Sequence, residues 1–226
     1  SIIRGGGVGG ATSAAGGPTS VERSIAVLPF DDLSPEGDQQ YFAEGLSEGI
    51  LHALAQFPDL KVAARTSAFL LAEQGADIET VASTLGVATV MEGSIQRAGD
   101  QIRITAQLIE AETSFHLWSE VFDRPFTDIF GIQDEIARAI VDRLQVTLAG
   151  GAPTELVAEA TSSTEAHEAY LRGRFFWNQR TEESLGTAIT EFQRAIDLDP
   201  NYSEAHAGLS DAYLLLDNYT LAPGRL

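Results

Sequence analysis

The stretch that decides the fold is SIAVLPFDDLSPEGDQQYFAEGLSEGI, residues 24–50. It begins with a short apolar run, Ile25 to Phe30, which is typical of a buried strand, and Pro29 indicates that strand pairing stops there or lies at an edge. Two adjacent carboxylates, Asp31 and Asp32, and a glycine-containing turn come next. Asp38 then opens a pattern with apolar residues every three or four positions, as on one face of a helix. These residues are Phe42, Leu46, Ile50, Leu54 and Phe57. The stretch therefore predicts a strand, a turn and a helix.

The pattern continues downstream with alternating strand-like and helix-like segments. A short strand is expected at 62–64, a helix at 67–73, and a second helix with Asp77 as its N-cap and Gly86 at its C-terminal end. Residues 87–96 and 101–111 are strand-like runs on either side of a turn at 97–100, and the second run alternates apolar and polar residues, which predicts a hairpin. Residues 115–123 extend it as a third strand, after a turn at Glu112 and Thr113. Thr127 is expected to cap a last helix with a stripe of isoleucines. The sequence predicts an α/β (α+β) mixed sheet covered by helices in two layers.

Composition limits the classes of partner. The chain has 226 residues, with 33 acidic residues against 14 basic ones and a formal net charge of −19. Such a charge repels nucleic-acid phosphates and anionic lipid surfaces, so neither is an expected partner. There are no cysteines, which excludes disulfides and thiolate metal sites. No apolar run is long enough to span a membrane.

The first 22 residues are built from Gly, Ala, Ser and Thr, so we interpret them as a flexible tail. Gly5, Gly7 and Gly10 satisfy the spacing of a dinucleotide-binding loop, but the strand before it and the helix after it are missing. No cofactor is therefore expected. Ile2 and Ile3 are candidates for self-association, because "SIIR" could add as a strand to the sheet edge of a neighbouring copy.

Residues 165–200 resemble a tetratricopeptide repeat. The residues that carry the resemblance are small and aromatic, at the spacing at which paired antiparallel helices interlock. They are Leu171, Gly173, Phe176, Ala188, Phe192, Ala195 and Pro200. A second repeat begins after Pro200, with Leu209, Ser210 and Tyr213 in its first helix. We expect a linker at 151–163 and a repeat segment at 164–226 that holds one full and one truncated repeat, in a chain that is a piece of a longer protein.

The motifs for catalysis are weak. Asp31 and Asp32 could hold a metal or act as an acid–base pair, but neighbouring strand residues point to opposite faces, so a solvated turn or a helix-capping role is the simpler interpretation. His52, His116, His167 and His206 are far apart in sequence and show no metal-ligand spacing. We therefore predict no catalytic and no metal-binding residues.

Five segments together resemble the TolB-like N-terminal domain of bacterial signalling proteins. They are "SIAVLPF", "YFAEGLSEGI", "VMEGSIQRAGDQIRITAQLIEAET", "HLWSEVFDR" and "DIFGIQDEIA". The resemblance covers residues 24–148, within a predicted domain at 23–150. It implies a place between a membrane-anchored effector, often an adenylate cyclase, and downstream repeats. It also implies tethering to the inner membrane, for which we favour the extracytoplasmic side, and it carries no catalytic residues.

The expected function is thus a non-enzymatic protein-interaction and signal-relay module of a larger bacterial signalling protein, binding protein partners or itself. Three alternatives stay open at this point. One is a subunit that assembles into a homopolymer through its N-terminal tail. Another is a small-ligand sensor with its site at the ends of the strands. The third is a hydrolase or metalloenzyme that uses Asp31 and Asp32.

Overall fold

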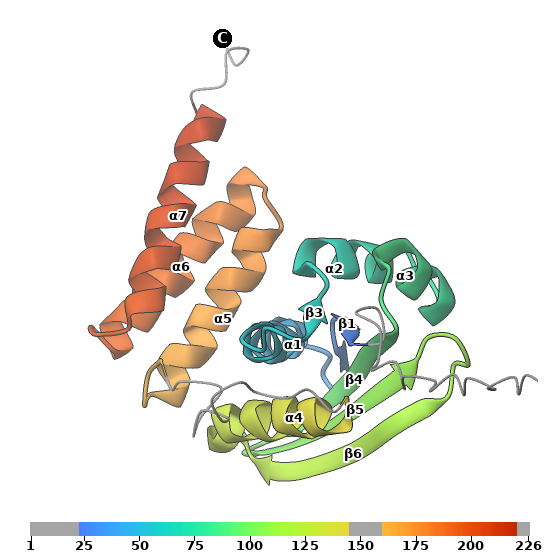
Figure 1. Ribbon diagram of the computed structural model, residues 1–226. Coiled ribbons are helices and arrows are strands. Elements are labelled where there is room, and N and C mark those ends of the chain that lie inside the picture. The colour runs from blue at the N-terminus through green and yellow to red at the C-terminus, as the bar shows by residue number, and fades with distance from the viewer. Residues whose placement is uncertain (1–22, 145–159, 221–226) are drawn as a thin grey trace, which may run out of the picture.

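The computed structural model describes residues 23–144 and 160–220 of the chain. We call residues 23–144 the sheet unit and residues 160–220 the helical segment. Figure 1 shows a twisted sheet with helices packed around it, and a stack of three helices whose first member, α5, lies beside α1. The predicted mixed α/β class followed by helices is confirmed.

The sheet is mixed, with its parallel strands at one side and its antiparallel strands at the other. Its strands run in the order β3-β1-β4-β5-β6. β1 (Ser24–Val27) is parallel to both β3 (Lys61–Val62) and β4 (Thr89–Ala98). β4, β5 (Gln101–Glu110) and β6 (His116–Pro125) form the predicted antiparallel meander. The predicted strand at 62–64 is shorter and begins one residue earlier.

A sixth strand, β2 (Asp31–Asp32), was predicted as a turn. It pairs in parallel with Ser94 and Ile95 of β4. Because Leu28 and Leu33 also donate backbone hydrogen bonds to β4, residues 28–33 stay alongside this strand after β1 ends. The prediction missed this pairing because two residues are too short for a periodic pattern.

Helices cover both faces of the parallel part of the sheet, so the expectation of two layers is wrong there. α1 (Gln40–Ala55) and α4 (Ile129–Arg143) form the main core with Ile25 and Val27. α2 (Arg65–Glu73) and α3 (Ile78–Leu85) pack on the other face against Ala26 and Leu28. Neighbouring strand residues point to opposite faces, and β1 is apolar on both, so each face requires a cover.

The helix ends agree with the sequence at one helix and differ at three others. The Asp77 side chain accepts from the backbone amide of Thr80, and Gly86 ends α3 with a φ of 67°, as predicted. The predicted cap at Thr127 is wrong, because a 3₁₀ turn, η1 (Phe126–Asp128), precedes α4 and Asp128 is its N-cap residue. α1 begins at Gln40, not at Asp38. α2 begins two residues before the predicted start, at Arg65.

The helical segment consists of α5 (Thr164–Asn178), α6 (Glu182–Leu198) and α7 (Ser203–Thr220). α6 packs on α5 and on α7. Thr181 and Ser184 close the start of α6 with reciprocal hydrogen bonds between side chain and backbone, an arrangement that satisfies otherwise unpaired amides. Most of the predicted linker at 151–163 lies outside the described residues, as do the N-terminal tail and residues 221–226.

Candidate functional site

The candidate site is the junction where α5 docks on the sheet unit. Leu171 of α5 is only 6% exposed and belongs to the core of the sheet unit. Its side chain lies against α1 at Gly45, where a β-carbon would come within 2.6 Å of Leu171 Cδ2. The sequence assigned Leu171 to packing between repeat helices, whereas the structure places it in the contact between the two units. Glycine at position 45 allows this close approach.

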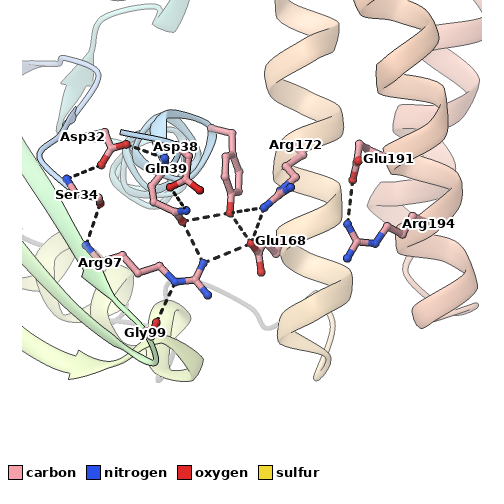
Figure 2. Close-up of polar contacts among 11 residues, drawn as sticks. Asp32, Ser34, Asp38, Gln39, Arg97, Gly99, Glu168, Arg172, Glu191 and Arg194 are labelled. Carbon is pink, nitrogen blue, oxygen red and sulfur yellow. Dashed lines mark hydrogen bonds and ion pairs between the residues drawn. The ribbon is translucent and has the colours of Figure 1, made fainter. Parts of the chain in front are cut away.

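Next to Leu171, one carboxylate oxygen collects three donors. Glu168 Oε1 accepts from the Tyr41 hydroxyl at 2.5 Å, from Arg172 Nη2 at 3.0 Å and from Arg97 Nη1 at 3.4 Å. Tyr41 belongs to α1, Arg97 to β4 and Arg172 to α5 itself. The Tyr41 hydroxyl also accepts from Arg172 Nη2 at 3.3 Å. Figure 2 shows Glu168 between Arg97 and Arg172, facing the loop that leads into α1. We call Tyr41, Arg97, Glu168 and Arg172 the junction cluster.

The sheet unit holds Arg97 of the junction cluster in place through three contacts. The Arg97 guanidinium stacks on the Phe126 ring at 3.6 Å, and its Nη1 donates to Gln39 Oε1 at 3.0 Å. The Arg97 backbone amide donates to the Ser34 hydroxyl at 3.0 Å. A stacked guanidinium with fixed hydrogen bonds loses little further freedom when it binds a carboxylate. Arg97 therefore stands preoriented toward Glu168.

Asp32, one of the two carboxylates singled out in the sequence, organises the loop before α1. It accepts from the backbone amides of Ser34 at 2.8 Å and of Gln39 at 2.7 Å (Figure 2). Burial alone would raise the pKa of Asp32, but these hydrogen bonds outweigh it and hold the pKa below its ordinary value. Gln39 is the N-cap residue of α1, so Asp32 fixes the backbone immediately before this helix. Asp31 lines a cleft next to α2, so the side chains of Asp31 and Asp32 do not meet at one site.

The charges of the junction cluster are fixed near neutral pH. Burial and the neighbouring carboxylate of Glu168 raise the pKa of Tyr41 to about 12, so its hydroxyl stays a donor. Burial would raise the pKa of Glu168, but the Tyr41 hydrogen bond and the two arginines outweigh it and lower that pKa. Glu168 is thus ionised and fully engaged through one oxygen. Charge-assisted hydrogen bonds of this kind are the stronger ones.

A second ionic contact joins the same two units on the other side of Leu171. Glu48 Oε1 of α1 lies 3.0 Å from Arg174 Nη2 of α5 and 3.3 Å from Arg65 Nε of α2. All three side chains are about three-quarters buried. Glu48 therefore ties α5 to α1 and α2 at once.

Three clefts lie at or near the junction. One of about 470 Å³ is lined by the loop at residues 34–39, the hairpin turn after Arg97, Glu168 and Arg172. A second, of about 510 Å³, lies on the other side of β2, between α2 and the polar face of β4 and β5, and Asp31 and Glu44 line it. A third, of about 380 Å³, is enclosed by α1, α4, α5 and the start of α7. In residues 23–144 and 160–220, no group of three or more metal-ligating side chains comes together.

Most of the residues predicted to pack the repeat make their contacts within the helical segment. The Phe192 ring fills the space next to Gly173 that a β-carbon would occupy. It does the same at Gly208, which the sequence analysis did not single out. Ala188 and Ala195 are buried in separate clusters, and Phe176 and Leu209 are partly buried beside Ala188. Pro200 lies in the turn before α7, and Tyr213 is 55% exposed. Ile2 and Ile3 lie outside the described residues.

The junction cluster itself was missed by the sequence analysis. Tyr41 and Glu168 are 127 positions apart, and nothing in the local pattern of either helix marks them. The sequence signal is that basic residues are few beside the acidic ones, 14 against 33, and that two of them, Arg172 and Arg174, lie on one turn of α5. For the described part of the chain, no helix is both long enough and apolar enough to span a bilayer.

Comparisons with known proteins give one relative in sequence and several similar structures. No family model matches the chain. A protein of Rhizobium meliloti (strain 1021) named "Putative adenylate cyclase 3" is 41% identical over 187 residues, which cover 83% of this chain and 32% of that protein. The chain thus spans about a third of the length of this relative.

The similar solved structures have low sequence identity. TolB of Acinetobacter baumannii has 19% identity and a TM-score of 0.42, covering 54% of this chain and 28% of TolB. Lipoprotein GNA1162 of Neisseria meningitidis has 16% identity and a TM-score of 0.40, covering 56% of this chain and 99% of that protein. The C-terminal domain of LpoB from Escherichia coli has 13% identity and a TM-score of 0.37, covering 48% and 87% of the two chains.

Proposed function

We propose that this chain is a non-enzymatic protein-interaction and relay module of a larger bacterial, membrane-associated signalling protein. In this proposal residues 23–150 are a TolB-like domain and residues 164–226 are tetratricopeptide repeats, tethered on the extracytoplasmic side. The name of the relative, "Putative adenylate cyclase 3", supports a signalling context, and that protein is about three times as long as its aligned part. Any cyclase chemistry would then belong to residues outside this chain.

The observation that carries the relay role is the junction cluster together with Leu171. Loosely connected domains move independently unless their interface is large and apolar. Here an apolar residue of the helical segment enters the core of the sheet unit. A carboxylate beside it is held by donors from two elements of that unit. A partner that displaces α5 would therefore also disturb its contacts with α1 and β4.

The two tryptophans provide a test, because one lies in each unit. Trp118 is in β6 and packs near Phe122, whereas Trp177 is in α5 under the Arg180 guanidinium. The Trp177→Phe variant reports on the sheet unit alone and the Trp118→Phe variant on the helical segment alone. We expect their urea unfolding curves to coincide. With Glu168→Gln added to each, the midpoint of the helical segment should fall below that of the sheet unit.

Two results would contradict the proposal. Separate midpoints in the unaltered junction would show that the two units are not coupled. Formation of cyclic AMP from ATP by this chain alone, with Mg²⁺ or Mn²⁺ present, would show that it is an enzyme.

A further inference from the structure

His167 lies at the seam between the two units and is almost completely buried, at 7% exposure. It belongs to α5, one residue before Glu168. Its ring lies 4.4 Å from the ring of Phe130 in α4, and its Nδ1 is 3.0 Å from the Tyr202 hydroxyl just before α7. The imidazole thus contacts the sheet unit on one side and the turn between α6 and α7 on the other.

The hydrogen bonds of His167 are incomplete. Nδ1 pairs with Tyr202, but Nε2 is buried and has no partner among the described residues. Leaving a buried polar atom unpaired costs free energy, and such an atom in a native structure calls for an explanation. The neutral imidazole has one such atom. The imidazolium would carry a full charge there and donate from both nitrogens.

Among residues 23–144 and 160–220, no free buried carboxylate faces an imidazolium at this position. His167 lines the cleft of about 380 Å³ at the seam. α1 contributes Glu48 and His52 to its wall, but Glu48 is already bound to two arginines and His52 is exposed. α4 contributes Phe130 and Gln133, which do not titrate.

The remaining elements do not supply a counter-charge either. α5 itself contributes Arg174, a like charge, and Tyr170. Glu204, at the start of α7, is exposed and accepts from Ser203. Asp199, at the end of α6, is engaged by the Thr161 hydroxyl at 2.6 Å.

We infer that protonation of His167 opens the contact between the two units. The protonated imidazole favours a state in which α5 has moved off α1 and α4, so that water reaches the ring. The inference deepens the proposed function, on which it rests, by naming what regulates the junction. Because Glu168 follows His167 directly, movement of the imidazole into water draws Glu168 away from Tyr41 and Arg97.

The size of the effect follows from linkage. Burial lowers the pKa of His167 to about 4, whereas a solvated histidine has a pKa of about 6.5. The open state therefore binds the proton more tightly, and opening becomes more favourable as the pH falls below 6.5. Between pH 7.5 and pH 5.0 these two pKa values give a rise of roughly 30-fold in the ratio of open to closed molecules.

The absence of cysteines allows a direct measurement. Cysteines placed at the exposed positions Gln96 on β4 and Thr190 on α6 take a donor and an acceptor dye without other labelling. Single-molecule energy transfer then gives the ratio of open to closed molecules from pH 7.5 to 5.0. We expect the ratio to rise about 30-fold in the labelled parent and less than two-fold with His167→Gln, which keeps a polar partner for Tyr202 but does not titrate. His52→Gln, in the wall of the same cleft, is the matched control and should behave as the parent.

The outcomes separate the alternatives. A parent with a pH-independent ratio, or a His167→Gln variant that opens like the parent, would overturn the inference. Loss of far-ultraviolet circular dichroism in step with the energy-transfer change would also overturn it, since acid would then unfold the chain and not open the seam. His167→Asn serves if His167→Gln does not fold. No partner is needed, so a negative result here leaves the unfolding test of the proposed function standing.

Discussion

The ring of Phe192 occupies the space that a side chain on Gly173 would need, since a β-carbon there would come within 2.6 Å of two ring atoms. Gly173→Ala should therefore destabilise the helical segment by about 1–3 kcal/mol, the usual cost of overpacking. Gly186 lies in the next helix, and a β-carbon there meets nothing within 4 Å. Gly186→Ala should stabilise by roughly 0.5–1 kcal/mol through helix propensity. Urea unfolding followed at Trp177 measures both, and equal effects of the two changes would contradict this packing.

Leu171 provides the apolar part of the contact between the two units. Leu171→Ala should cost roughly 2–5 kcal/mol, the range for a buried leucine that leaves a cavity. The loss should appear mainly as earlier unfolding of the helical segment, because α5 loses its anchor in the sheet unit. Leu198→Ala, at a leucine of α6 that is 45% exposed, is the control and should leave the midpoint nearly unchanged. A similar loss in both variants would mean that Leu171 does not hold the units together.

Glu168 provides the polar part. Glu168→Gln removes the charge that faces Arg97 and Arg172 and weakens the bond from Tyr41, and we expect a cost of about 1–3 kcal/mol. Salt should narrow the difference between the variant and the parent, since it screens the ionic component. The matched change Asp211→Asn, at an exposed position of α7, should not shift the unfolding midpoint. An unchanged midpoint with Glu168→Gln would show that the junction cluster contributes no stability.

Tyr41 makes the junction sensitive to alkaline pH. Its pKa is about 12 in the folded chain and about 10 when solvated. A raised pKa means that its contribution is complete below pH 10 and is lost as the pH rises toward 12. The loss amounts to roughly 3 kcal/mol. Tyr41→Phe should make the fall in unfolding free energy between pH 10 and 12 less steep, whereas Tyr213→Phe, at an exposed tyrosine, should not. Equal slopes in the parent and Tyr41→Phe would contradict the assignment.

Local periodicity predicted most of the fold. The stripe from Phe42 to Leu54 and the alternation in residues 101–111 each follow from one element facing one core. Coverage of the second face was missed, although the signal was present: a run such as Ile25 to Leu28 that is apolar at every position indicates a strand buried on both sides.

The site was less predictable for a physical reason. Tyr41 and Glu168 meet only because Leu171 anchors α5 on α1, and that contact depends on the absence of a side chain at Gly45. Neither helix shows the relation alone, since both residues fit an ordinary half-polar helix face. The same holds for His167. Its burial between Phe130 and Tyr202, which leaves Nε2 without a partner among the described residues, is apparent only in the folded structure.

In the proposed relay, the use of a single oxygen by two donors of the sheet unit has a consequence for how the junction would separate. If each donor had its own acceptor, α5 could slip from one contact while keeping the other, and the response would be graded. Tyr41 and Arg97, both of the sheet unit, converge on Glu168 Oε1, so a movement of α5 that displaces this atom releases both contacts together, while Arg172 on the same helix moves with Glu168. In the proposed relay, these two contacts of the junction cluster would therefore be made or broken together.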